Sequence, residues 1–385
     1  MKRVLIITPS FNSGGTTTSL MNISSSIDKS KYEIWVYPIN NEGPNRDFIA
    51  QHCHIIGADV SKSSHPATIS DRFRRQLFWF VKKIKKRLEF LGIDIAPIVF
   101  RSVAHKLDAG NYDFVVAFQE GLATRFCSYF KHGKKIAWVR AEYGRYLSLS
   151  GVKPEAKLYG KYDAIVNVSQ AAAENFLSYL PMYRQKTHVL YNVINADRVL
   201  LMSSDAVDDI TFDTFTIVSV GRIDPVKRFS EIPRIASALS EKGLHFKWLI
   251  IGGVASEDEL KSIKDGLTAY HQEENVFLLG RRANPYPYMK KSNLLVCLSS
   301  SETFNNTLTE AKILGVPVVT TDFACACESI REGFDGFISP IDNIQDKIAE
   351  MIGNKDIYYT IRKNLSDYKH SNAETFDKLY SVILK

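Results

Sequence analysis

Short apolar runs alternate with stretches of helical periodicity along the whole chain. Most runs are continuous rather than alternating, which is typical of parallel strands buried on both faces of a sheet. In the first half we expect strands at residues 4–8, 34–38, 114–117, 136–139, 164–168 and 187–190. In the second half we expect strands at residues 215–220, 247–251, 276–279, 294–298, 317–320 and 336–338. The helices between them imply right-handed βαβ units.

Two such series predict an α/β protein of two doubly wound domains, which suits a chain of 385 residues. We expect the first domain at residues 1–195 and the second at residues 212–369. The join is expected near residues 195–211, where residues 202–209 are polar and aperiodic. A last helix at about residues 370–385 is expected to pack back on the first domain. The apolar residues on one side of this helix are Phe376, Leu379, Tyr380, Val382 and Ile383.

The composition is that of a soluble globular protein, with 45% hydrophobic and 24% charged residues. The net charge of +7 is unevenly spread along the chain. Residues 1–195 hold 27 Lys and Arg against 15 Asp and Glu, whereas the remainder hold 22 against 27. This split indicates two domains with different partners.

Five scattered cysteines argue against a disulfide framework and for a reducing compartment. Cys325 and Cys327 are spaced like a metal or redox pair, but no second ligand pair lies at zinc spacing, so we interpret them as small loop residues. The apolar run at residues 4–7 is too short for a signal peptide, and no run reaches the length of a membrane-spanning helix. We therefore expect a cytoplasmic protein.

One tract combines two carboxylates with the order strand, polar loop, helix, strand. Glu302 follows the apolar run 294–298, and Glu310 lies eight positions later, in the first turns of the next expected helix. Ligands bind at the carboxyl ends of the strands in open α/β sheets, so the tract predicts a site. Paired carboxylates also act as the acid and base of glycoside hydrolysis, a role that this tract alone leaves open.

A loop in the same half places two cations after a strand. Gly221 and Arg222 follow the run 215–220, and Lys227 comes five residues after Arg222. A guanidinium can grip a diphosphate bidentately, and an ammonium adds a point charge. A solvated basic turn is the alternative, and the Glu302–Glu310 tract in the same half favours a binding loop.

In the first half, Gly14 and Gly15 open a helix directly after the first strand. Amides at a helix start with no Cβ in the way suit a phosphate or a reacting sugar. A tight turn with a Thr or Ser cap explains the pair equally well. The loop is neither the dinucleotide fingerprint nor a P-loop, which disfavours a dehydrogenase.

Together these motifs resemble the retaining GT-B glycosyltransferases, specifically family 4 of the group 1 type. That family pairs a G-R-x-x-x-x-K loop with an E-x7-E tract, which are present here in residues 221–227 and 302–310. Residues 310–322 also resemble its EAxxxGxPVVxTD segment. The resemblance covers nearly the full chain and is more specific in the second half. It implies a GT-B fold, in which two Rossmann-like domains face each other across a cleft.

The resemblance implies a role for each matching residue. Arg222 and Lys227 hold the diphosphate of a nucleotide-sugar. Glu310 accepts hydrogen bonds from the ribose hydroxyls, and Glu302 faces the donor sugar. The implied donor-binding residues are Gly14, Gly15, Gly221, Arg222, Lys227, Arg281, Glu302, Phe304, Asn305, Asn306, Thr307 and Glu310. The implied catalytic residues are Glu302, Arg222, Lys227 and Arg140.

The resemblance also implies the reaction. A sugar, with a UDP-sugar as the favoured donor, moves with retention to a glycan or lipid-linked acceptor in surface polysaccharide biosynthesis. The leaving diphosphate takes the acceptor proton, so the family needs no protein nucleophile, no metal and no cofactor. Fixed cations and helix-start amides stabilise the diphosphate, and cleft closure excludes water.

Two positions depart from the family pattern. Asn305 stands where the family usually has glycine, and it adds a side chain near the donor sugar. After the expected strand at 136–139, where many members carry a histidine, this chain has Arg140 and Glu142. Either residue takes over a contact with donor or acceptor, or the two form a structural ion pair.

Residues 72–88 predict a basic amphipathic helix, with eight cations between residues 72 and 87. Phe78 and Trp79 lie among the basic residues, partly off the apolar stripe. Such helices bind anionic bilayers, so we expect peripheral contact with the inner face of the cell membrane. An ordinary Rossmann helix with solvated lysines is the alternative. No nucleic-acid module is visible, and nucleic acid is not an expected partner.

The sequence therefore predicts a glycosyltransferase at a membrane surface. Two alternatives stay open at this point. One is a GT-B-related nucleotide-sugar epimerase. The other is a nucleotide-sugar-binding protein whose catalysis has lapsed, since the usual first-domain histidine is missing.

Overall fold

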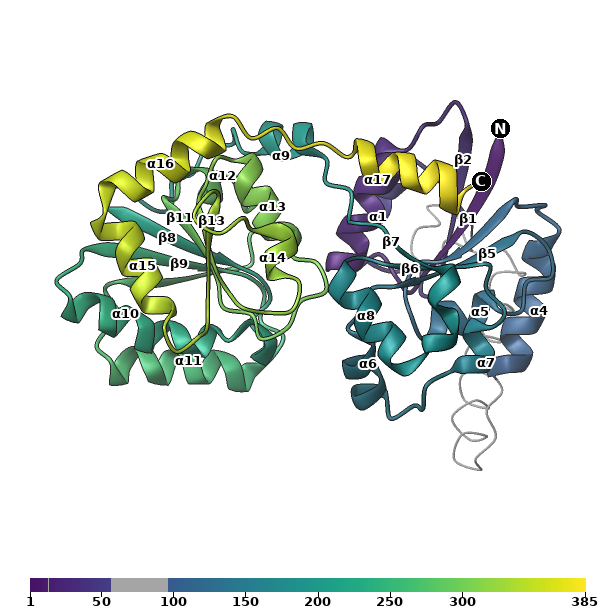
Figure 1. Cartoon of the computed structure of the whole chain (residues 1–385), viewed down its shortest axis with the longest axis horizontal. Helices are drawn as coiled ribbons and strands as arrows, with labels where there is room; N and C mark the ends of the chain where they lie inside the picture. Colours follow the sequence, from purple (N-terminus) through teal and green to yellow (C-terminus); the bar gives the residue numbers. More distant parts are fainter. Residues whose placement is uncertain (13, 57–95) are drawn as a thin grey trace, which may run out of the picture. The chain divides into compact units, whose positions relative to one another are not determined.

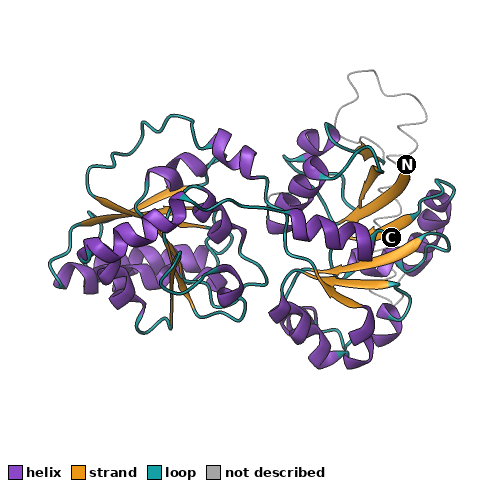
Figure 2. Cartoon of the chain, turned by 45° about the horizontal axis from the view of Figure 1, so that its top comes forward, coloured by secondary structure: helices purple, strands orange, loops and turns teal. Residues whose placement is uncertain are grey.

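The computed structural model describes residues 1–12, 14–56 and 96–385 (Figure 1). These residues form two compact units. Unit 1 comprises Met1–Asn167, Asn175–Leu190 and Phe376–Lys385, and unit 2 comprises Val168–Glu174 and Tyr191–Thr375. In each unit a sheet lies at the centre with helices on both faces (Figure 2). The two Rossmann-like α/β domains predicted from the hydrophobic pattern are thus confirmed.

The described part of unit 1 contains a seven-stranded parallel sheet in the order β3-β2-β1-β4-β5-β6-β7. Its strands are β1 (Lys2–Thr8), β2 (Tyr32–Pro38), β3 (His54–Ile55), β4 (Phe114–Ala117), β5 (Lys134–Val139), β6 (Ala164–Asn167) and β7 (Thr187–Val189). At the centre, Leu5 pairs with Val115 and Ile7 with Ala117, and all four are fully buried. Helices cover both faces of a parallel sheet, which is why the central runs at residues 4–7 and 114–117 are apolar and buried.

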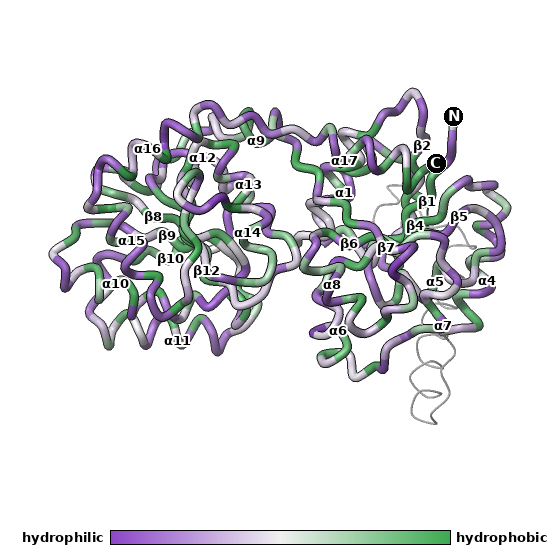
Figure 3. Tube along the Cα trace, viewed as in Figure 1, coloured by the Kyte–Doolittle hydropathy of each residue, from purple (hydrophilic) through white to green (hydrophobic). Residues whose placement is uncertain are grey.

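Unit 2 contains, within the residues described, a six-stranded parallel sheet in the order β10-β9-β8-β11-β12-β13. Its strands are β8 (Phe215–Val220), β9 (Phe246–Ile251), β10 (Val276–Gly280), β11 (Leu294–Cys297), β12 (Val318–Thr321) and β13 (Gly336–Ser339). Hydrophobic residues run along β8 and β9 here and along β1 in unit 1 (Figure 3). Strand order changes direction beside β8 and β11, which is where ligands bind in open α/β sheets.

The described α-helices are α1 (Gly15–Ser26), α2 (Arg46–Ala50), α4 (Ala96–Asp108), α5 (Leu122–Cys127), α6 (Tyr143–Ser150), α7 (Ala156–Tyr159), α8 (Gln170–Tyr179), α9 (Ala196–Met202), α10 (Ile232–Glu241), α11 (Glu257–Ala269), α12 (Tyr286–Lys291), α13 (Asn306–Ile313), α14 (Ala326–Ser329), α15 (Ile344–Gly353), α16 (Lys355–Ser366) and α17 (Ala373–Lys378). Four shorter helical turns complete the set: η1 (Pro181–Lys186), η2 (Pro225–Lys227), η3 (Phe229–Glu231) and η4 (Leu379–Ile383).

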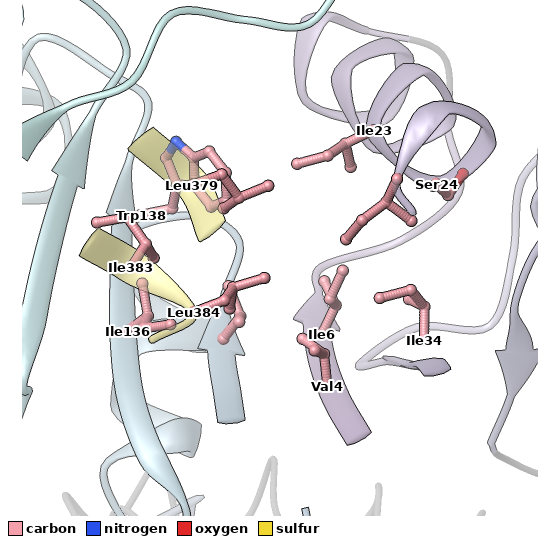
Figure 4. A pocket seen from close by; sticks show the side chains of 12 residues that line it. Val4, Ile6, Ile23, Ser24, Ile34, Ile136, Trp138, Leu379, Ile383 and Leu384 are labelled. Carbon is pink, nitrogen blue, oxygen red and sulfur yellow. The ribbon is translucent and has the colours of Figure 1, made fainter. Parts of the chain in front are cut away.

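The end of the chain packs on unit 1. Tyr380 stacks on Tyr32 with ring centroids 5.2 Å apart, and its hydroxyl accepts a hydrogen bond from the Asp28 amide at 2.9 Å. Leu379 and Ile383 close an apolar pocket between α1 and the sheet, as Figure 4 shows. This segment therefore completes the hydrophobic core of unit 1.

The last turn differs from the expected helix in one respect. The Leu384 amide donates to the Leu379 carbonyl at 2.7 Å, five residues back, so η4 is a π-helical turn. Val382 lies within this turn and is exposed, whereas Leu379 and Ile383 are buried. The expectation that Val382 shares the buried side was wrong, because consecutive residues of a helix point about 100° apart, so Val382 and Ile383 do not share one side.

The twelve expected strands are all present, with ends shifted by one or two residues. The prediction missed β3, whose two residues are too short for a recognisable pattern. The expected functional limits 1–195 and 212–369 stay a prediction, because packing and ligand binding need not divide a chain at the same residue. The expected basic helix at 72–88 lies outside the described residues.

Among the described residues, no helix combines the length and the apolar character needed to cross a bilayer. Nor does the described part of the chain bring three or more His, Cys, Asp or Glu side chains together as metal ligands.

Candidate active site

The carboxyl ends of β8 and β9 approach each other closely in unit 2. The Gly221 amide donates to the Ile251 carbonyl, and the Gly252 amide donates to the Gly280 carbonyl, both at 3.0 Å. A Cβ atom on Gly252 would lie 1.6 Å from the Gly221 carbonyl oxygen. No side chain fits at Gly252, so bare backbone forms this edge of the sheet.

The loop after β8 brings Lys227 next to Glu302. Asp224 Oδ1 accepts the amides of Val226 and Lys227 at 3.1 and 3.3 Å, which closes η2. The Ser300 amide donates to the Val226 carbonyl at 2.8 Å and ties this loop to the segment after β11. As a result, Lys227 Nζ lies 2.5 Å from Glu302 Oε1.

This ion pair keeps the lysine charged. Burial alone would lower the pKa of Lys227, but the Glu302 carboxylate beside it more than offsets burial and raises that pKa. The two side chains are only 20% and 15% exposed, so the charges are fixed and little screened by solvent. An anion that binds at this sheet edge would compete with Glu302 for the Lys227 ammonium group.

Glu302 Oε1 has two further donors. The Ser299 hydroxyl donates to it at 2.7 Å and the Asn305 amide group at 3.2 Å. The Asn305 side chain also donates to Cys297 Sγ and accepts the Thr307 amide as the N-cap of α13. Its backbone is ordinary and extended, with φ −93° and ψ 99°, so this position does not need the unusual angles that glycine allows.

Arg222 lies at the same edge but outside this network. Its guanidinium contacts Asp224 at 3.1 Å, and its side chain is 68% exposed. An exposed guanidinium held by one carboxylate can reorient toward a ligand at little cost. The structure therefore gives the loop one fixed cation, Lys227, and one adaptable cation, Arg222.

Glu310 lies deeper, on α13. Its side chain is buried, and Oε1 accepts a hydrogen bond from the Tyr286 hydroxyl at 3.1 Å. Burial raises the pKa of Glu310 to about 7, while the Tyr286 hydrogen bond and the charge of Arg198 oppose the rise. Near neutral pH this carboxyl is poised between its two charge states.

The loop between Glu302 and Glu310 is held by neighbours from α9 and the chain before it. The Phe304 ring lies 5.8 Å from the Tyr191 ring, and Asn306 Oδ1 accepts a hydrogen bond from Asn192 at 3.0 Å. Thr307 follows Asn306 at the start of α13. Arg281 lies beyond the end of β10, exposed, with its Cδ 3.8 Å from where a Cβ on Gly253 would stand.

The edge of unit 1 has a different character. Gly14 precedes α1 and Gly15 opens it, and a Cβ atom on either glycine would meet nothing within 4 Å. Space alone therefore does not require glycine at either position, but the backbone of Gly14, with φ 157°, favours glycine there. What glycine does provide is free access to the amides at a helix start.

Arg140 lies after β5, 9% exposed. Its Nε donates to the Phe118 carbonyl and its Nη1 to the Ser19 hydroxyl, each at 3.0 Å. The guanidinium lies 4.0 Å from the Phe118 ring centroid, a cation–π geometry. Burial lowers the pKa of Arg140 to about 9, and the nearby Glu120 carboxylate opposes this shift.

Glu120 is a buried residue that the sequence did not single out. Its Oε2 accepts the amides of Arg140 and Ala141 at 2.8 and 3.2 Å. The sequence feature that could have identified Glu120 is its place shortly after the strand at 114–117, which puts this carboxylate at the same sheet edge as Arg140. Tyr286 was missed as well, because a tyrosine early in a helix carries no spacing signal.

The structure thus brings some of the expected site residues into direct contact. In unit 2, Lys227, Glu302 and Asn305 share one network, with Arg222 beside the same loop and Glu310 further along α13. In unit 1, Gly14 and Gly15 lie at the start of α1, where an added Cβ atom would meet nothing within 4 Å. Arg140 is buried and donates a hydrogen bond to the hydroxyl of Ser19 on α1.

Comparison with known proteins agrees with this architecture. Residues 206–369 match the family model described as glycosyl transferases group 1, and residues 13–198 match that of glycosyltransferase family 4. An N-acetylgalactosaminyltransferase of Campylobacter jejuni, which acts on a diacetylbacillosaminyl-diphospho-undecaprenol substrate, is 26% identical over 380 residues, covering 98% of this chain and 97% of that protein.

Two further similarities are with a capsular polysaccharide enzyme and a solved structure. The capsular polysaccharide biosynthesis glycosyltransferase CapM of Staphylococcus aureus is 29% identical over 182 residues, covering 45% of this chain and 47% of that protein. The crystal structure of Anabaena HepE with UDP-glucose covers 100% of both chains with a TM-score of 0.72 at 15% identity, which supports the fold. The chain belongs to the group 1, family 4 glycosyltransferases.

Proposed function

We propose that this glycosyltransferase moves a sugar from a nucleoside-diphosphate sugar, foremost a UDP-sugar, to a glycan or lipid-linked acceptor during surface polysaccharide biosynthesis, with retention of configuration. The acceptor class is supported by the Campylobacter jejuni relative, whose substrate is linked to diphospho-undecaprenol, and by the capsular polysaccharide enzyme. The donor class is supported by the UDP and UDP-glucose complexes of HepE.

The observation that carries the proposal is the pair of cations at the edge of the unit 2 sheet. Lys227 is fixed and keeps its charge, and Arg222 is exposed and free to turn. Both cations can stabilise a bound diphosphate, whose negative charge grows as the glycosyl bond breaks. Glu302 holds Lys227 in place before the donor binds and faces the donor sugar afterwards.

The remaining unit 2 residues place the rest of the donor. Glu310 accepts the ribose hydroxyls, and the backbone at Phe304–Thr307 follows the sugar and the phosphates. Arg281 and Gly221 flank the base and the diphosphate. The Asn305 side chain is committed to Glu302 and the α13 cap, so it shapes the sugar pocket without being free to move.

In the proposed reaction, the bond from the anomeric carbon to the diphosphate oxygen breaks, and a bond from that carbon to the acceptor oxygen forms on the same face. The acceptor proton passes to the departing diphosphate oxygen. Arg222 and Lys227 stabilise the charge on that diphosphate in place of a divalent metal. The amides at Gly14 and Gly15 stabilise it further, and Arg140 supports this helix start through Ser19.

The experiment is a donor screen with the purified protein and lipid-linked acceptors, run with and without a chelator. We expect transfer from one UDP-sugar, unaffected by the chelator, that disappears in Glu310→Ala and Lys227→Ala. Lys242→Ala is the matched control, because Lys242 pairs with Asp346 on the surface, away from the sheet edge. It should leave transfer unchanged.

Other outcomes would overturn the proposal in distinct ways. Tight nucleotide-sugar binding without transfer to any acceptor would favour a protein whose catalysis has lapsed. Conversion of the donor to its epimer without an acceptor would favour an epimerase. If a chelator abolishes transfer, the claim that the reaction needs no metal is wrong. If the product has the inverted anomeric configuration, the claim of retention is wrong.

A further inference from the structure

Tyr286 makes a contact that its place in the fold does not require. The residue opens α12, is 7% exposed, and belongs to an apolar cluster with Ile194, Val199 and Leu308. A phenylalanine would fill that cluster as well. The hydroxyl, however, donates to Glu310 Oε1 at 3.1 Å. A buried tyrosine hydroxyl that finds a carboxylate partner acts on that carboxylate.

Glu310 depends on this contact because of where it lies. Its carboxyl is buried among apolar side chains, an environment that disfavours the charged form. Two groups oppose this in the described residues: the Tyr286 hydroxyl on α12 and the Arg198 guanidinium on α9. The other elements packed on α13 are β11, whose Cys297 bonds to Asn305 and Ser299, and β12, which has no ionisable residue.

The Tyr286 side chain is itself held firmly. The backbone amide of Tyr286 donates to Asn284 Oδ1 at 3.2 Å, and the Asn284 side-chain amide donates to the carbonyl of Met202, the last residue of α9, at 2.7 Å. Burial raises the pKa of Tyr286, and the charge of Glu310 raises it further, so the hydroxyl keeps its proton. It is therefore a permanent donor at a fixed position.

We infer that Tyr286 is a positioning residue for donor binding: its hydroxyl holds Glu310 through one carboxylate oxygen, in the charged form, so that the other oxygen serves the ribose hydroxyls of the nucleotide. The inference rests on the proposed function, in which Glu310 reads the ribose. It adds that the preference for a ribonucleotide over a deoxyribonucleotide depends on a side chain that does not touch the donor.

The test measures UDP and 2′-deoxy-UDP binding by calorimetry at pH 7 and pH 8.5 for the full chain and for Tyr286→Phe. If losing the hydrogen bond raises the pKa of Glu310 by about one unit, UDP binding weakens about fivefold at pH 7 and less than twofold at pH 8.5. The preference for UDP over the deoxy analogue falls as well. With saturating donor, kcat changes less than about twofold, because the chemistry lies elsewhere.

Tyr288→Phe is the matched control. Tyr288 lies on the same helix, is equally buried, and donates its hydroxyl to Asp209 at 2.9 Å instead of Glu310. It should leave both UDP affinity and its pH dependence unchanged. In a Glu310→Gln background, Tyr286→Phe should have no further pH-dependent effect, since the titrating group is gone.

The outcomes separate the inference from the function beneath it. If the parent protein binds UDP and Tyr286→Phe binds it equally at both pH values, the inference is overturned while the proposed function stands. If Tyr288→Phe produces the same shift, a general loosening of α12 explains the effect, and the inference is again overturned. A folded parent protein that binds none of UDP, GDP or ADP would overturn the proposed function and the inference together.

Discussion

The carboxyl edges of the two sheets differ in how far their cations are buried. In unit 2, Lys227 and Arg222 stand at the edge with their charges accessible, one fixed by Glu302 and one exposed. In unit 1, Arg140 is enclosed by Phe118, Ser19 and the chain around Glu120. The same fold thus offers cations to a ligand on one sheet and buries its cation inside the other.

The comparison teaches where to look for function in a doubly wound fold. An edge cation that keeps its charge and some exposure can bind an anion, whereas a buried cation such as Arg140, bonded to the Phe118 carbonyl and the Ser19 hydroxyl, mainly holds the chain around it in place. The glycines differ in the same way. Gly252 is required by the packing of unit 2, whereas Gly15 borders open space in unit 1.

The largest expected effect distinguishes Lys227 in unit 2 from Arg140 in unit 1. Lys227→Met should lower kcat/KM by about 10²–10³-fold, because it removes a fixed charge from the transition state. Its fold should persist, since Glu302 keeps Ser299 and Asn305 as donors. Arg140→Met should lower the free energy of unfolding by about 3 kcal/mol, since it leaves the buried Phe118 carbonyl and the Ser19 hydroxyl without their guanidinium donor.

Steady-state kinetics and urea unfolding of both variants check this pair. The contrast between the two cations would be contradicted if Lys227→Met lowered the free energy of unfolding as much as Arg140→Met does. It also breaks if Arg140→Met keeps full stability and loses only activity, which would make Arg140 a direct contact of the substrate.

The glycines give the next effect. Gly252→Ala should lower the free energy of unfolding by roughly 3 kcal/mol, because the new methyl group overlaps the Gly221 carbonyl. Gly15→Ala should leave stability unchanged or raise it by up to about 1 kcal/mol, since alanine favours a helix. Thermal unfolding distinguishes them, and donor KM should rise in Gly15→Ala although its stability is kept. Equal melting temperatures would refute the assignment.

Glu310 should make stability depend on pH. Its folded pKa of about 7 lies above the ordinary value of 4.5, so its ionisation opposes folding. This cost is absent below pH 4.5 and complete above pH 7. Glu310→Gln should therefore stabilise the protein by about 2–3 kcal/mol more at pH 8 than at pH 5. Glu273→Gln, at an exposed position, is the control, and a pH-independent difference would contradict the prediction.

A further difference between the two halves concerns the positive charge of the first half of the chain. Changing Lys82, Lys83, Lys85 and Lys86 to Glu should abolish flotation with vesicles that contain anionic lipid, because each cation near such a surface contributes about 1 kcal/mol. Vesicles of neutral lipid provide the control. Flotation that is unchanged by the four substitutions would exclude this segment as the membrane contact.

The sequence by itself determined the two parallel sheets and the loops that carry the site. Continuous apolar runs such as residues 215–220 and 294–298 can only be buried on both faces, which places Arg222 and Glu302 at strand ends. Spacing along the chain is enough for this, because a strand and the loop that follows it are neighbours. The sequence did not predict the two-residue strand β3 or the π-helical turn η4, because neither leaves a periodic pattern.

Only the tertiary structure decided which side chains meet. Lys227 and Glu302 are 75 positions apart, and Tyr286 and Glu310 are 24 apart on different helices. Nothing in the local pattern records such contacts, because they depend on strand order and helix packing. The resemblance to family 4 pointed to Glu302 and Glu310, and the fold then gave them different surroundings: Glu302 lies beside a lysine, and Glu310 is buried beside a tyrosine.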